Sequence, residues 1–165
     1  MEVVSYKKVK SNLYEVVIKD GLSKETYQIY DDIILEYELL IDRTLTKKKL
    51  NTIIKENEML TGYYEALKYI ARKMRTEKEV RIFLKKKEYS LYAIDKAIEK
   101  LKKDGYLNPK IYVSSYINDA IVLTLDGPLK IKDSLINLGI DESLINSELE
   151  KISEEVFEEK IRKII

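Results

Sequence analysis

Basic side chains at helical spacing are the leading candidates for a binding surface in this sequence. Lys68, Arg72 and Arg75 recur at intervals of four and three residues, which places them on one face of a helix. Further basic residues follow at similar intervals between residues 78 and 86. Such stripes are suited to bind a phosphate backbone or an acidic protein surface.

The candidate partner-binding set also contains two tyrosines. Its members are Lys68, Arg72, Lys73, Arg75, Lys78, Arg81, Lys85, Lys86, Tyr112 and Tyr116. The arginines of this set are stronger candidates for binding than the lysines, because a guanidinium can hold a carboxylate or phosphate with two parallel hydrogen bonds. Tyr112 and Tyr116 lie one helical turn apart and could stack on a partner or a base. The competing interpretations are that the stripes are solvated helix faces and that the tyrosine pair is half-buried core.

The distribution of charge favours a binding surface in the middle of the chain. Residues 62–106 carry 13 basic and 7 acidic side chains, a net charge of +6. Residues 107–165 carry 7 basic and 11 acidic side chains, a net charge of −4. We therefore expect two surfaces of opposite charge that face different partners.

Residues that catalysis commonly needs are missing. The chain has no cysteine and no histidine, which excludes thiolate metal sites and catalytic dyads or triads that depend on either residue. The five glycines never cluster into a phosphate-binding loop. The carboxylates of Glu154, Glu155, Glu158 and Glu159 could ligate a hard cation on paper, but a solvated helix face explains them far better. We predict a protein that is not an enzyme and uses no cofactor or metal.

The elements that carry these residues change type along the chain. Residues 3–9, 13–19 and 25–30 are rich in β-branched residues and tyrosine, which predicts a small antiparallel sheet. Helical spacing begins at Asp31, and Thr46 is a candidate N-cap for a further helix. Beyond Gly62 the pattern predicts only helices. The first covers residues 63–75, the second begins at a capping box formed by Thr76 and Glu79, and the third begins at an N-cap at Ser90.

An internal repeat organises the helical part. When the chain is shifted by 51 residues, Val80 falls on Ile131 and Leu84 falls on Leu135, and the caps also coincide. A period of this size is typical of tandem helical arrays. We predict a mainly α fold, with tandem three-helix repeats in an elongated array after an N-terminal antiparallel β-sheet with a helix. The predicted segments are an N-terminal extension with one or two helices (1–61), a first repeat (62–106), a second repeat (107–153) and the start of a truncated third repeat (154–165).

Three motifs within this array resemble the RecX family. Residues 64–80 resemble the opening of the first RecX repeat, in which an alanine-leucine helix is followed by an arginine-rich turn and Ser/Thr-x-x-Glu-Leu. Residues 101–108 resemble its leucine to glycine-tyrosine-leucine junction, and residues 127–140 resemble the second repeat from its glycine-proline start. The sequence departs from the family pattern at Met74, where proline is frequent, and at Glu88, where glycine is common.

The resemblance implies a regulator of the RecA recombinase. Such a protein would lie in the groove of the RecA–DNA filament, inhibit recombinase and co-protease activity, and so modulate DNA repair, recombination and the SOS response. The expected partners are the RecA filament and single-stranded or double-stranded DNA. The alternative is a helix-turn-helix-like DNA-binding module that acts without RecA. We expect a cytoplasmic monomer without a membrane partner, because no apolar run approaches about 20 residues and residues 1–4 lack the features of a signal peptide.

Overall fold

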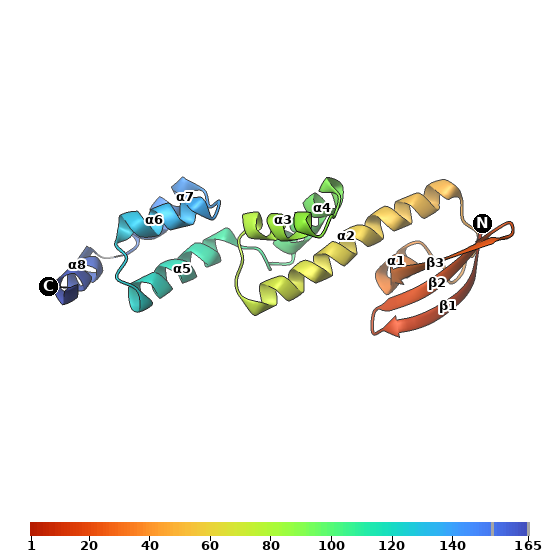
Figure 1. Ribbon diagram of the computed structural model, residues 1–165, viewed down its shortest axis with the longest axis horizontal. Helices are drawn as coiled ribbons and strands as arrows, with labels where there is room; N and C mark the ends of the chain where they lie inside the picture. Colours follow the sequence, from red (N-terminus) through yellow and green to blue (C-terminus); the bar gives the residue numbers. More distant parts are fainter. Residues whose placement is uncertain (153, 165) are drawn as a thin grey trace. The chain divides into compact units, whose positions relative to one another are not determined.

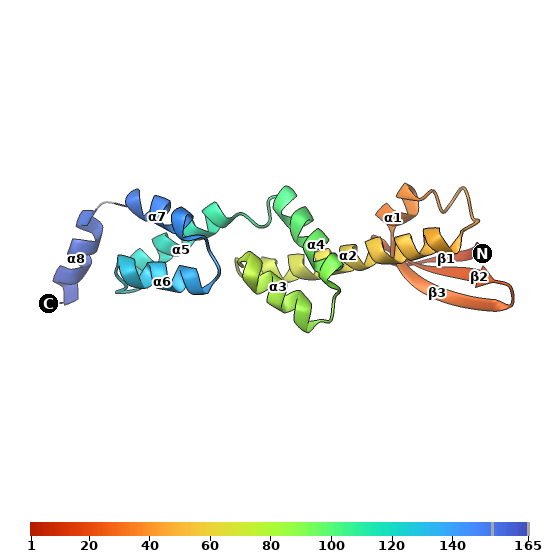
Figure 2. The same cartoon turned by 90° about the horizontal axis from the view of Figure 1, so that it is seen from above.

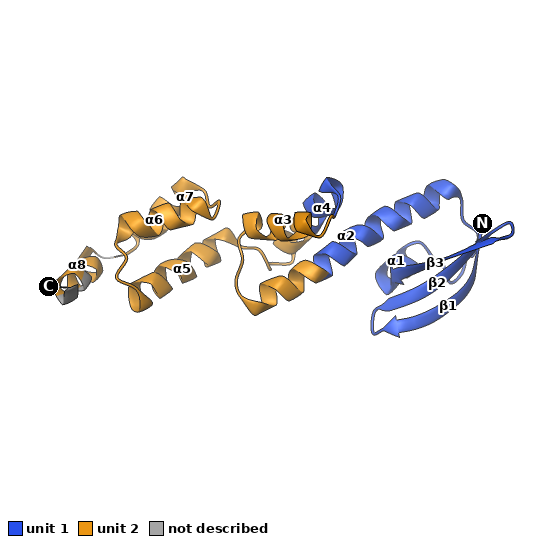
Figure 3. Cartoon of the chain, viewed as in Figure 1, with its two compact units in different colours: residues 1–64, 89–97 blue, residues 65–88, 98–165 orange. Residues whose placement is uncertain are grey.

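The computed structural model describes residues 1–152 and 154–164 and forms two compact units. The first unit comprises residues 1–64 and 89–97, and the second comprises residues 65–88 and 98–165 (Figure 3). Within the described ranges the chain is mainly helical and begins with a small sheet, which confirms the predicted fold class. Ile165, at the end of the predicted third-repeat segment, lies outside the described residues.

The N-terminal sheet is an antiparallel meander of three strands. Strands β1 (Glu2–Lys10), β2 (Leu13–Asp20) and β3 (Ser23–Tyr30) are neighbours in chain order (Figure 1). Tyr6 pairs with Val16, and Val16 pairs with Tyr27 across the sheet. The predicted strands are confirmed, and β3 begins two residues earlier than the pattern indicated.

One face of this sheet is buried by helices. Helix α1 (Asp31–Glu36) follows β3 directly, and α2 (Lys47–Arg72) begins after a turn. A single core joins residues of the sheet, α1 and the first part of α2, with Val16, Ile29 and Ile53 almost fully buried. The hydroxyl oxygen of Thr46 accepts a hydrogen bond from the Lys49 amide at 3.1 Å, as expected for an N-cap.

Asn57 of α2 closes part of the outer edge of β3. Its side-chain amide donates to the carbonyl oxygen of Gln28 at 2.7 Å, and its side-chain oxygen accepts from the amide of Tyr30 at 3.0 Å. The side chain thus satisfies backbone groups that an edge strand otherwise leaves open.

Replacing this asparagine tests its contribution to stability. Asn57→Ala is expected to lower the free energy of unfolding by about 2 kcal/mol, because two hydrogen bonds to strand backbone are lost at about 1 kcal/mol each. Urea denaturation followed by circular dichroism measures the effect. The matched control is Asn51→Ala at an exposed position of the same helix, and an equal loss in both variants would contradict the edge-closing role.

Helix α2 corrects one expectation from the sequence. The pattern predicted a separate helix over residues 63–75, but α2 runs without a break from Lys47 through Gly62 to Arg72. Its buried side continues across the glycine, because Leu60, Tyr63 and Ala66 are all buried. A glycine inside a helix costs only about 1 kcal/mol, and packing on both sides of Gly62 outweighs that cost.

The remaining helices form the predicted repeat. They are α3 (Glu77–Lys86), α4 (Leu91–Lys103), α5 (Pro109–Leu123), α6 (Pro128–Asn137), α7 (Glu142–Glu150) and α8 (Glu154–Ile164). A shift of 51 residues superposes the ends of α2 and α5, both ends of α3 and α6, and the starts of α4 and α7. Val80 and Ile131 are both fully buried, which confirms that the two positions are equivalent.

Backbone geometry repeats with the same period. The Val80 amide donates to the Thr76 carbonyl oxygen at 3.1 Å, and the Ile131 amide donates to that of Gly127 at 3.1 Å. Glu88 and Gly139, also 51 residues apart, both have positive φ, at 66° and 85°. Each follows the end of its helix, where a left-handed residue satisfies open carbonyl groups. Helix α7 differs from α4 at its start, because Asp141 precedes it without capping a backbone amide.

Substitutions at the two positions with positive φ, Glu88 and Gly139, should have opposite effects on stability. Glu88→Gly should raise the free energy of unfolding by about 1 kcal/mol, because glycine adopts positive φ without steric cost. Gly139→Ala should lower the free energy of unfolding by about 1–2 kcal/mol. Alanine rarely adopts the positive φ of this position, and its Cβ would lie 2.9 Å from Cδ of Lys78. Urea denaturation checks both, with Lys87→Gly as a destabilising control at φ −85°.

The segment boundaries and the elongated shape stay predictions. The second repeat has its own small buried cluster in α5–α7, where α6 and α7 lie against α5 (Figure 2). An array of such clusters should give a radius of gyration well above the value of about 15 Å for a compact domain of this length. Small-angle X-ray scattering measures that radius, and a value near the compact one would refute the array.

Candidate nucleic-acid and protein interface

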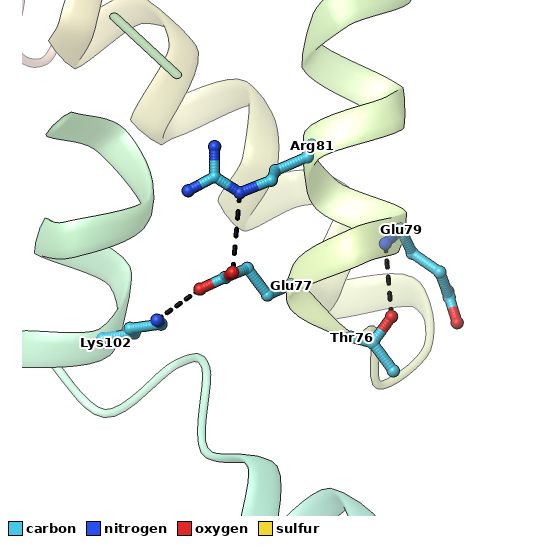
Figure 4. A network of polar contacts seen from close by, with 5 residues as sticks. All are labelled: Thr76, Glu77, Glu79, Arg81 and Lys102. Carbon is cyan, nitrogen blue, oxygen red and sulfur yellow. Dashed lines mark hydrogen bonds and ion pairs between the residues drawn. The ribbon is translucent and has the colours of Figure 1, made fainter. Parts of the chain in front are cut away.

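The basic residues of the candidate set surround the turn between α2 and α3. Thr76 fixes the start of α3, because its hydroxyl oxygen accepts from the Glu79 amide at 3.2 Å (Figure 4). Helix α2 ends at Arg72, and α3 begins after the Thr76 cap. The basic residues therefore lie on the last turns of α2, in the turn itself and on one side of α3. The structure separates these residues into two groups, one exposed and one held by neighbours.

We call the first group the exposed basic set. Its members are Lys68, Arg72, Lys73, Lys85 and Lys86. All five are exposed, and none of them belongs to an ion pair among the described residues. Lys78 is also exposed, but its ammonium group donates to the carbonyl oxygen of Asn137 at 3.0 Å and so joins α3 to the end of α6. The exposed basic set is therefore the part of the candidate residues that a partner can reach.

Arg75 belongs to the second group. Its guanidinium lies 4.0 Å from the centre of the Tyr69 ring, and Nη1 is 3.6 Å from Oε2 of Glu79. Tyr69 stacks in turn on Phe83, with ring centres 4.2 Å apart and planes 2° from parallel. The ammonium group of Lys87 lies 5.3 Å from the centre of the Phe83 ring. Arg75 thus contributes to the packing of α2 on α3 more than to an open surface.

Arg81 is held through Glu77. Nε of Arg81 lies 3.5 Å from Oε2 of Glu77, and Lys102 of α4 forms an ion pair with the same carboxylate (Figure 4). Burial raises the pKa of the Glu77 carboxyl group, but the hydrogen bond and charge of Lys102, together with Arg81, outweigh burial and lower the pKa below its ordinary value. The ionised group therefore contributes stability that is lost as the pH falls through the lowered pKa.

The tyrosine pair lies on α5 and is largely part of the core. Tyr112 is only 8% exposed and belongs to the buried cluster of the second repeat, while Tyr116 is partly buried beside it. Their ring centres are 6.3 Å apart. Burial, reinforced by the charges of Glu79 and Tyr116, raises the pKa of Tyr112 to about 12. The burial of Tyr112 matches the core interpretation of this pair.

A group of exposed aliphatic side chains surrounds the turn between α5 and α6, and sequence reasoning missed it. Its members are Val122, Leu123, Leu125 and Leu129. Their exposed fractions lie between 68% and 79%. The equivalent residues 51 positions earlier are Ala71, Arg72, Met74 and Lys78. Two of these four positions are basic in the first repeat, whereas all four are apolar in the second, a difference that a residue-by-residue alignment of the repeats would have revealed.

Among the residues that the structure describes, no three histidine, cysteine, aspartate or glutamate side chains are grouped so as to hold a metal ion. None of the described helices is long and apolar enough to cross a membrane.

Comparison with known proteins gives consistent matches. Residues 63–101 match the family model described as RecX, first three-helix domain. A regulatory protein RecX of Listeria monocytogenes serotype 4a (strain HCC23) is 26% identical over 152 residues, which cover 92% of this chain and 55% of the relative. One of Lactococcus lactis subsp. lactis (strain IL1403) is 32% identical over 155 residues, which cover 93% of this chain and 57% of the relative. The chain thus spans about half the length of the curated relatives it matches.

Two solved structures are also similar. A crystal structure of regulatory protein RecX has a TM-score of 0.86 and 23% identity, and the match covers 98% of this chain and 79% of that one. The crystal structure of RecX from Lactobacillus salivarius has a TM-score of 0.61 and 30% identity, and the match covers 64% of this chain and 68% of that one. The fold and the family-model match therefore point in the same direction.

Proposed function

The chain belongs to the RecX family, and we propose from this membership that it binds the filament of the RecA recombinase on DNA and inhibits its recombinase and co-protease activities. The matched curated relatives are named regulatory proteins. In this proposal the chain is a cytoplasmic monomer without enzymatic activity that modulates DNA repair, recombination and the SOS response. It would act by occupying the filament groove and bridging successive RecA subunits.

The observation that carries the proposal is the exposed basic set. Five cationic side chains without ion-pair partners among the described residues gather on a segment with a net charge of +6. A RecA filament presents both DNA phosphates and acidic protein surface to such a segment. Complementary charge of this kind accelerates association and fixes orientation.

A DNA-binding module that acts without RecA is the second candidate. The same five side chains could contact phosphates directly, and short capped helices such as α3 and α4 are common in DNA-binding domains. The acidic character of residues 107–165 opposes this alternative, because a long DNA-contacting surface should be basic throughout.

Co-sedimentation distinguishes the two candidates. The chain is expected to pellet with RecA filaments assembled on single-stranded DNA and to lower their rate of ATP turnover. It should pellet much less with the same DNA alone at about 0.15 M salt, where isolated phosphate contacts are weakened. Equal binding to naked DNA would favour the second candidate, and failure to bind either target would refute both.

A further inference from the structure

A pocket of about 360 Å³ opens within the second compact unit where three helices begin. Thr76 and Glu77 line it from the start of α3, Asn108 and Pro109 from the start of α5, and Asp141 from the start of α7. A volume of this size lies within the range of small-ligand sites. None of the residues in the exposed basic set lines this pocket.

The pocket wall is partly apolar. Leu107, Pro109, Ile140 and Leu144 contribute aliphatic surface. Such a wall suits one apolar side chain together with its adjoining backbone, because burial of apolar surface drives binding and a few polar groups fix the orientation.

Two donors at the pocket have no acceptor in the described part of the chain. Tyr112 lines the pocket, is more than nine-tenths buried, and its hydroxyl group makes no hydrogen bond to a described residue. Nε of Arg75 is buried and also lacks an acceptor. The buried Nε of Arg75 without an acceptor is unfavourable, and a ligand that supplies the acceptor would remove that cost. The Tyr112 hydroxyl group is a second donor that such a ligand can use.

The start of α7 adds open donors. Thr76 and Asn108 cap α3 and α5 with their side chains, but Asp141 caps no backbone amide of α7. The first amides of α7 have no partner within the helix, and the helix dipole favours negative charge beside them.

The charges at the pocket favour a singly charged group. Glu77 is already neutralised by Lys102 and Arg81. The carboxylate of Asp141 contributes one further negative charge and would repel a phosphate dianion more strongly than a carboxylate.

We propose that this pocket binds a short segment of a protein partner in which an apolar side chain lies next to a carboxylate. The carboxylate accepts from the Tyr112 hydroxyl group, Nε of Arg75 and the first amides of α7, and the apolar side chain packs on Leu107, Ile140 and Leu144. The proposal does not require the partner to be RecA, so it is tested without the filament.

The probe is the capped dipeptide N-acetyl-leucyl-glutamate amide, titrated into the ¹⁵N-labelled full chain. Saturable amide shifts are expected at residues 77 and 142–144. Tyr112→Phe should weaken the affinity about tenfold, because it removes one hydrogen bond to a charged group and leaves the ring in place. Tyr116→Phe is the matched control, since Tyr116 lies one turn further along α5 and does not line the pocket; its affinity should equal that of the unsubstituted chain.

Several outcomes would overturn the proposal. They are the absence of saturable shifts at millimolar peptide, equal affinity for the glutamine analogue of the probe, and tighter binding of inorganic phosphate at the same amides. If circular dichroism shows that Tyr112→Phe does not fold, Leu144→Ala replaces it. That variant should weaken binding of the leucine peptide but not of its alanine analogue, and equal affinity of the variant and the unsubstituted chain for the leucine peptide would also overturn the proposal.

Discussion

Reversal of Lys68, Arg72 and Lys73 to glutamate is expected to leave the chain folded and to weaken inhibition of RecA ATP turnover by about tenfold or more. All three side chains are exposed at the end of α2. Exposed substitutions usually change the free energy of unfolding by less than about 0.5 kcal/mol each. Like charges brought together across an interface, in contrast, cost on the order of several kcal/mol of binding free energy. Circular dichroism and steady-state ATP turnover on single-stranded DNA measure the two effects.

A matched variant controls for the change in net charge. Lys7, Lys19 and Lys24 are exposed on the three strands of the N-terminal sheet, and their reversal to glutamate alters the total charge by the same amount. This variant should inhibit nearly as well as the unsubstituted chain. If both triple variants lose inhibition equally, the exposed basic set is not a specific contact surface.

The structure changes which arginines are suitable for this experiment. From the sequence, reversal of Arg72, Arg75 and Arg81 would be chosen and folding would be expected to persist. Arg75 lies over Tyr69 and beside Glu79, and Arg81 lies beside Glu77, so reversal would place like charges in contact in both cases. Spacing along a helix identifies a face, but it does not reveal which charges on that face a neighbouring helix has already paired.

Local signals in the sequence predicted the fold well where the determining interactions are themselves local. Thr76 and Ser90 cap their helices as expected, since each cap depends on residues within the next turn. The continuity of α2 through Gly62 was missed because packing decides it and the intrinsic preference of glycine does not. The pocket at the starts of α3, α5 and α7 was also missed, because it joins residues more than 60 positions apart, such as Arg75 and Leu144.

Truncation of equivalent core leucines should destabilise both repeats strongly. Leu84 and Leu135 are both fully buried and stand 51 residues apart. Leu84→Ala and Leu135→Ala should each lower the free energy of unfolding by about 3–5 kcal/mol, which combines the lost transfer energy with the energy of the cavity left behind. Leu129→Ala is the control at a position that is 79% exposed, and it should change stability by less than about 0.5 kcal/mol.

The comparison between the two buried leucines is more informative than either value alone. Domains are commonly stable by only about 5–15 kcal/mol, so a single truncation can unfold the repeat that contains it. In a tandem array the loss is concentrated in that repeat and its immediate neighbour. Hydrogen exchange should therefore show that Leu135→Ala reduces amide protection mainly in α5–α7, and that Leu84→Ala reduces it mainly in α3 and the last turns of α2. A large cost for one leucine with almost none for the other would show that the two repeats share backbone geometry without sharing an equivalent core.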